Sequence, residues 1–139
     1  MSWSNAYLGI PYADIGRSRA GCDCWGLARL VYGAELAITL PDYADGYVSA
    51  EEQAEVAALI GQETTASIWQ PVKSPMPFDL LLFRHGRHSS HVGIFVADGL
   101  MLHMATDDQS KHEGITSPRW VSRLVGTFRH AQCRLKGAL

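Results

Sequence analysis

The residue best suited to chemistry in this sequence is Cys24, which lies in the stretch Gly21-Cys22-Asp23-Cys24-Trp25-Gly26. Asp23 is a good N-cap residue, and small or apolar residues follow at helical spacing, so a helix is expected to begin at Cys24. These positions are Cys24, Leu27, Ala28, Val31 and Ala34. Unpaired N–H groups at a helix start favour thiolate over thiol, which makes Cys24 a candidate nucleophile. Free cysteine is also a common core residue, so Cys24 alone leaves a structural role open.

A nucleophilic cysteine needs a nearby base and a third group that orients the base, and both can be distant in sequence. Two of the six histidines lie in strand-like surroundings, His91 before Val92-Gly93-Ile94 and His103 within residues 100–104. A strict two-residue turn at Asp98-Gly99 would place them on opposite faces of a hairpin. A catalytic pair therefore requires an odd-length loop or a bulge between the two strands.

The same residue types also bind metals, so a zinc site is the competing interpretation. Cys22 and Cys24 could join His85, His88 and His91 as ligands. Structural zinc sites usually use matched cysteine pairs, and no second pair exists here. We therefore expect no metal or other cofactor, and a polar loop around residues 85–90.

Composition indicates one globular domain over residues 1–139. Hydrophobic residues make up 47% and charged residues 19%, with a net charge of -2, which argues against nucleic acid as a partner. Three cysteines make a poor disulfide framework, and no catalytic role is expected for Cys22 or Cys133. No signal peptide and no membrane-spanning stretch is recognisable, so a soluble chain made in the cytoplasm is expected.

The order of the elements positions these residues. Helices are expected over residues 2–8, 24–36 and 50–60, with a loop from 9 to 19. Strands are expected over residues 67–72, 78–84, 91–97, 100–105 and 124–130. Helices first and strands afterwards predict an α+β fold, in which the helical half packs on a mainly antiparallel sheet.

Together these motifs resemble the NlpC-type cysteine endopeptidases of bacterial peptidoglycan, which have a compact papain-like fold. The stretch Asp23-Cys24-Trp25-Gly26-Leu27 resembles the nucleophile motif, and His91-Val92-Gly93-Ile94-Phe95 resembles the histidine motif. Phe78-Asp79-Leu80-Leu81-Leu82-Phe83 resembles the strand before the base. Gly9-Ile10-Pro11-Tyr12 is similar to the segment that keeps a tyrosine near the nucleophile. His103 sits where the family has its third, usually polar, residue.

The chemistry expected of these residues is acyl transfer through a thioester. Cys24 attacks the amide carbonyl, His91 holds the thiolate as an ion pair and then protonates the leaving amine, and His103 orients His91. The Cys24 backbone N–H is one expected donor to the oxyanion, and the resemblance implies the Tyr12 hydroxyl as a second.

Three further residues are expected near the substrate. The resemblance places Asp23 near the substrate amine as well as at the helix cap. Trp25 stands where the family more often has serine, so it is expected to shape the cleft, and Phe78 stands where glycine is usual. Arg19, with Arg17 on the same loop, is a candidate contact for an anionic peptide.

The resemblance also implies a substrate and a carrier. The substrate is the stem peptide of peptidoglycan, cleaved between D-γ-glutamate and the diamino acid. The Cys-Trp-Gly-Leu sequence at Cys24 resembles small family members carried by phage tails, which implies a tail-tip protein of a virion or phage-like particle that acts at the cell wall or periplasm. The alternative is a tail-assembly module that keeps the fold without catalysis.

Overall fold

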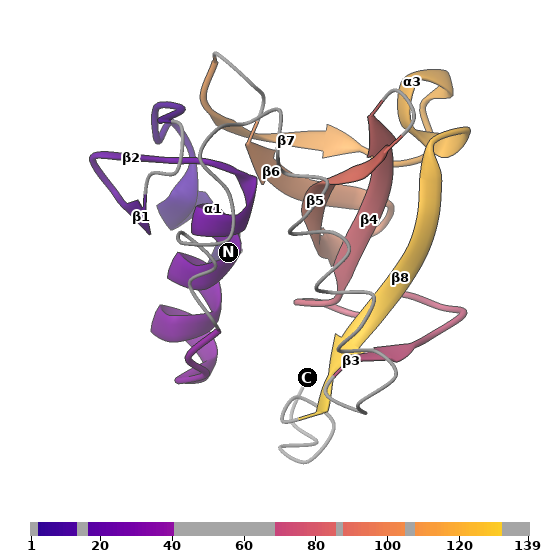
Figure 1. Cartoon of the computed structure of the whole chain (residues 1–139), viewed down its shortest axis with the longest axis horizontal. Helices are drawn as coiled ribbons and strands as arrows, with labels where there is room; N and C mark the ends of the chain where they lie inside the picture. The colour runs from indigo at the N-terminus through magenta and orange to yellow at the C-terminus, as the bar shows by residue number, and fades with distance from the viewer. Residues whose placement is uncertain (1–2, 14–16, 41–68, 86–87, 105–107, 132–139) are drawn as a thin grey trace.

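The computed structural model describes residues 3–13, 17–40, 69–85, 88–104 and 108–131. Within them a helix lies against a six-stranded antiparallel sheet, which confirms the expected α+β class (Figure 1). The helical elements are η1 (Trp3–Tyr7, a 3-10 helix), α1 (Cys24–Val31), η2 (Tyr32–Leu36) and α3 (Pro118–Val121). The strands are β1 (Arg17–Ser18), β2 (Gly21–Cys22), β3 (Trp69–Pro71), β4 (Leu80–His85), β5 (His88–Ala97), β6 (Leu100–Met104), β7 (Ser110–Gly114) and β8 (Leu124–His130).

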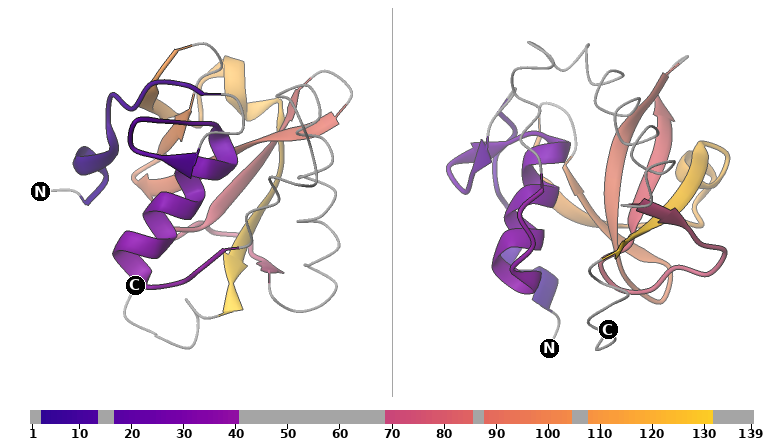
Figure 2. Two further views of the ribbon diagram at one scale, coloured as in Figure 1. Left: turned by 60° about the vertical axis from the view of Figure 1, so that its left-hand side comes forward. Right: turned by 60° about the horizontal axis from the view of Figure 1, so that its bottom comes forward.

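The large sheet has the strand order β3-β8-β4-β5-β6-β7, and α1 stands against one side of it (Figure 2). Side chains alternate between the two faces of each strand. Leu82, Ile94 and Leu102 belong to a core cluster shared with α1. Phe83 and Phe95 belong to a second cluster, which contains Trp120 of α3. Buried side chains therefore lie on both faces of the sheet, against α1 on one face and against Trp120 of α3 on the other.

The helix that carries Cys24 begins where the sequence predicts. The Asp23 carboxylate accepts a hydrogen bond from the Gly26 N–H at 2.7 Å, which satisfies one unpaired donor of the first turn. After Val31 the chain continues as the π-helical turn η2, and it ends at Ala37, whose φ of 56° is left-handed. The wider π turn changes which side chains face the core, so Tyr32 and Leu36 are buried there. Ala34, which its helical spacing placed on the same face as Cys24, is exposed.

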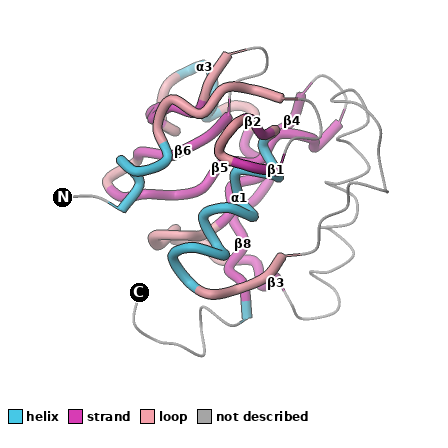
Figure 3. The backbone as a smooth tube through the Cα atoms, turned by 90° about the vertical axis from the view of Figure 1, so that its left-hand side faces the viewer, coloured by secondary structure: helices cyan, strands magenta, loops and turns pink. Residues whose placement is uncertain are grey.

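Residues 9–13, expected as loop, form an extended strap between two parts of the molecule. On one side, Ser110 N–H donates to the Ile10 carbonyl at 2.9 Å, so the strap pairs with the edge strand β7. On the other side, Cys22 N–H donates to the Pro11 carbonyl at 3.1 Å, which pairs the strap with β2. The strap thus links the edge of the large sheet to the small hairpin directly before Cys24, and Figure 3 shows that hairpin beside the start of α1.

Phe78 explains why β4 starts two residues later than predicted. Its φ of 77° lies in the left-handed region that favours glycine, so the chain turns there and pairs from Leu80 onward. The Phe78 ring stacks on Trp3 with centroids 4.4 Å apart, and its carbonyl accepts a hydrogen bond from the Tyr32 hydroxyl. These contacts offset the cost of a non-glycine residue at this turn.

The other predicted elements agree with the structure only in part. The strand predicted at 91–97 begins earlier, at His88, while 124–130 matches β8. The elements β1, β2, β7 and α3 were not expected. The predicted helix at 50–60 and Cys133 lie outside the described residues. No helix in the described part of the chain is long and apolar enough to cross a membrane.

Candidate functional site

Cys24 is the first residue of α1, and this helix packs against β5 and β6, the strands that carry the two histidines. Its side chain is buried, with 5% of its surface exposed, in the core cluster of α1. Cys22 is also buried, and neither of these two cysteines is in a disulfide. The structure therefore places a reduced thiol at a capped helix start, as the sequence predicts.

His91 and His103 lie on one face of the sheet because of a bulge in β5. In the β5–β6 pairing, Phe95 lies opposite Met101 while Ala97 lies opposite Leu100, so one extra residue separates the partners on β5. The turn itself has two residues, Asp98 and Gly99, both with positive φ. The required odd residue thus comes from the bulge rather than from a longer loop.

The two histidines are in direct contact. His91 Nε2 lies 3.0 Å from His103 Nδ1, which is hydrogen-bond distance, and both rings are largely buried. The Trp120 ring stacks on His91 with centroids 5.2 Å apart and an interplanar angle of 21°. Trp120 was not a sequence candidate, because the four residues of α3 are too few to show a helical period.

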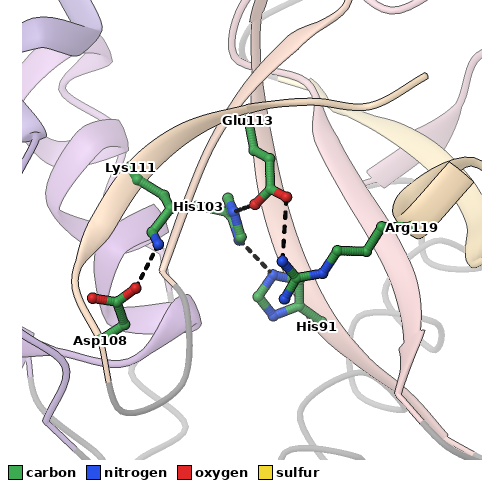
Figure 4. Close-up of polar contacts among 6 residues, drawn as sticks. All are labelled: His91, His103, Asp108, Lys111, Glu113 and Arg119. Atoms are coloured by element: carbon green, nitrogen blue, oxygen red, sulfur yellow. Dashed lines mark hydrogen bonds and ion pairs between the residues drawn. The ribbon is translucent and has the colours of Figure 1, made fainter. Parts of the chain in front are cut away.

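Glu113 extends the contact beyond the predicted residues. Its Oε1 lies 2.7 Å from His103 Nε2, so His91, His103 and Glu113 form a continuous series across β5, β6 and β7 (Figure 4). Arg119 Nη1 lies 3.5 Å from the other carboxylate oxygen. The stretch Ser110–Gly114 has no apolar alternation, so only its pairing with β6 reveals that it is a strand and that Glu113 faces His103.

The protonation of this series follows from its surroundings. Burial lowers the pKa of His103, although the Glu113 carboxylate opposes that shift. Burial alone would raise the pKa of Glu113, but the neighbouring Trp120, His103 and Arg119 outweigh it, and the pKa is lowered. At neutral pH His103 is therefore uncharged and Glu113 is a carboxylate.

The other predicted site residues have varied positions. Tyr12 is half-buried on the strap, and its backbone forms an isolated parallel β-bridge with that of Cys22. Asp23 and Trp25 are fully buried, so Asp23 acts as the helix cap and Trp25 packs in the core cluster of α1. Any influence of Trp25 on a substrate would act through the position of Cys24. Arg19 is exposed, and its Nη1 donates to the Ala6 carbonyl at 2.8 Å while its guanidinium lies over the Tyr7 ring.

Among the residues that the structure describes, no group of three or more His, Cys, Asp or Glu side chains is arranged to hold a metal ion. The side chains of Arg17, His85 and His88 lie outside the described set. The structure brings His91, His103 and Glu113 together beside Trp120, whereas Cys24 lies in the core cluster of α1. A thiol, two imidazoles and a carboxylate are the groups of nucleophilic acyl transfer.

Comparison with known sequences identifies relatives of this chain. Residues 9–129 match the profile of the NlpC/P60 family. The "Probable endopeptidase p60" of Listeria monocytogenes is 30% identical over 128 residues, which cover 88% of this chain and 22% of that protein. The "Murein DD-endopeptidase MepS/Murein LD-carboxypeptidase" of Escherichia coli K12 is 24% identical over 117 residues, covering 84% and 54%. The chain thus spans from about a fifth to about half of these relatives.

Comparison with solved structures gives the same fold. An NlpC/P60 family protein from Bacillus cereus ATCC 10987 superposes with a TM-score of 0.65 at 23% identity, covering 91% of this chain and 37% of that one. The NlpC/p60 domain of the peptidoglycan hydrolase SagA superposes with a TM-score of 0.62 at 20% identity, covering 91% and 92%. These likenesses confirm the expected papain-like architecture.

Proposed function

Because this chain belongs to the NlpC/P60 family, as the match over residues 9–129 shows, we propose that it is a cysteine peptidase that cleaves peptidoglycan stem peptides. The observation that carries the proposal is the contact between His91 and His103, on the two strands against which the helix of Cys24 packs. The contact requires the bulge in β5, and it is formed between two buried rings; a purely structural hairpin requires neither feature.

In the proposed reaction, Cys24 as thiolate attacks the amide carbonyl of the substrate and forms a tetrahedral oxyanion. The backbone N–H of Cys24 and the Tyr12 hydroxyl stabilise that oxyanion. Protonated His91 then gives its proton to the leaving amine, which leaves a thioester on Cys24. A water molecule, deprotonated by His91, attacks the thioester, releases the carboxylic acid product and restores the ion pair of the Cys24 thiolate and protonated His91.

The finer substrate and the carrier are also proposed. The bond between D-γ-glutamate and the diamino acid is the expected cleavage position, and Arg19 is an exposed cation proposed to contact an anionic peptide. The Cys-Trp-Gly-Leu sequence at Cys24 supports a tail-tip location on a phage or phage-like particle, acting at the cell wall. Both proposals rest on sequence resemblance.

Digestion of purified muropeptides, followed by mass spectrometry, tests this function. The unmodified chain should release fragments that define the cleaved bond, and Cys24→Ala should release none. A Cys22→Ala variant is the matched control, because it removes the neighbouring thiol and should retain cleavage. No release by the unmodified chain would support the structural tail module instead, and equal release by the unmodified chain and Cys24→Ala would overturn Cys24 as the nucleophile.

A further inference from the structure

Glu113 is the one carboxylate in direct contact with the histidine pair among the described residues. The Oε1–Nε2 distance of 2.7 Å is typical of a charge-assisted hydrogen bond. His103 is 1% exposed, so its Nε2–H has little access to water as an alternative partner. Arg119 is largely exposed and its contact with Glu113 is long, so the shorter contact with His103 is the stronger one.

We propose that Glu113 is a positioning residue, which sets the tautomer of His103 and thereby the direction of the hydrogen bond between His103 and His91. The proposal rests on the function proposed above, because the direction of the hydrogen bond between His103 and His91 matters for the reaction of Cys24. Glu113 itself touches neither Cys24 nor the substrate in this role.

The Glu113 carboxylate determines which nitrogen carries the proton at each step of the series. An ionised carboxylate only accepts hydrogen bonds, so His103 Nε2 must carry a proton toward Glu113. A neutral imidazole has one N–H, and His103 is neutral because burial lowers its pKa. His103 Nδ1 is therefore an acceptor, and His91 Nε2 must be the donor across their 3.0 Å contact. This leaves Nδ1 of His91 as the nitrogen that accepts a proton.

The same series stabilises the charged form of His91. When His91 is protonated it donates to the lone pair of His103, and the negative charge of Glu113 at the far end favours that positive charge. If the carboxylate is removed, the buried His103 Nε2–H loses its partner, and His103 is free to present Nδ1–H to His91 instead. The reversed hydrogen bond would put the lone pair of His91 on the wrong nitrogen.

Nitrogen-15 NMR of the histidine side chains tests the geometry without any need for activity. In the unmodified chain His103 should be the Nε2–H tautomer, with a strongly downfield Hε2 proton. In Glu113→Ala that proton should lose its downfield shift and the Nδ1–H tautomer should appear. Glu113→Gln keeps an oxygen acceptor and should be intermediate. Glu35→Gln, which removes a carboxylate bonded to Tyr7 instead, should leave the His103 signals unchanged.

Kinetics with muropeptides tests the consequence. Glu113→Ala should lower kcat by about 10- to 100-fold, the size seen when outer partners of site residues are lost, with KM nearly unchanged. Glu113→Gln should recover much of that loss. Identical His103 signals, or an identical kcat, in folded Glu113→Ala and the unmodified chain would overturn the proposal. Absence of cleavage by the unmodified chain would instead count against the proposed function, and the NMR result would still decide the role of Glu113.

Discussion

The cysteine side and the histidine side of the site are held in place by different kinds of interaction. Cys24 owes its position to neighbours in sequence, because the Asp23 cap bonds to Gly26 only three residues away. His91, His103 and Glu113 owe theirs to pairing among β5, β6 and β7 and to one bulge. A local cap can be changed with local effect, whereas a shift in register would turn every following side chain to the other face.

The largest expected effect comes from removing His91, the proposed base. His91→Ala should lower kcat for muropeptide cleavage by about 10²- to 10⁴-fold, because the variant lacks the imidazole proposed to transfer the proton. Alkylation of Cys24 by iodoacetamide at neutral pH should also slow. His112→Asn is the control, since His112 lies on β7 but contacts Ser4 instead. Equal losses in the two variants would mean that the histidine effect is structural.

Gly93→Ala should perturb the histidine side by steric contact. A Cβ at this position would lie 2.7 Å from Met101 Sδ and 3.6 Å from the Cβ of His103. Because Met101 is fully buried, we expect the free energy of unfolding in urea to fall by about 1–3 kcal/mol. Gly33→Ala in η2 meets nothing within 4 Å and should be neutral or stabilising. A larger loss of stability for Gly33→Ala than for Gly93→Ala would contradict the contacts at these two glycines.

Asp23→Ala tests the local character of the cysteine side. Loss of the cap should cost about 0.5–2 kcal/mol in urea unfolding, with Asp23→Asn closer to the unmodified chain. Amide exchange should accelerate at Gly26, whose N–H loses its acceptor, and stay unchanged in β5 and β6. Faster exchange throughout the sheet would show that the two sides are more closely coupled than the contacts indicate.

The smallest effect is a pH dependence of stability on the histidine side. The pKa of His103 lies below its ordinary 6.5 and that of Glu113 below its ordinary 4.5. In each case the unfolded chain binds a proton at higher pH than the folded protein does, so the free energy of unfolding falls on acidification. The contribution of His103 to the free energy of unfolding is lost as the pH falls below 6.5, and that of Glu113 is lost as the pH falls below 4.5. Urea titrations across this range should be flatter for His103→Gln, and an unchanged slope would exclude His103 as the source.

Sequence alone was more informative for the cysteine side. The N-cap and the bounds of the helix from Cys24 to Leu36 follow from short-range preferences that residue types express directly. The contact of His91 with His103 required a bulge. The alternation of side chains along the strands predicts that an extra residue is needed, but it does not show where that residue lies. Glu113 and Trp120 stayed hidden because β7 lacks apolar alternation and α3 is a single turn. Their positions depend on pairing and packing between distant segments.

The strap has a consequence for how the protein is made. Ile10 N–H bonds to the hydroxyl of Ser110, a residue 100 positions later in the chain. A ribosome delivers the strap and Cys24 well before β7 emerges to pair with the strap. During most of synthesis the thiol is therefore carried by a chain whose sheet edge does not yet exist. Closure of the strap joins residues 100 positions apart, a long-range contact of the kind that slows folding, and it requires β7 to have been made.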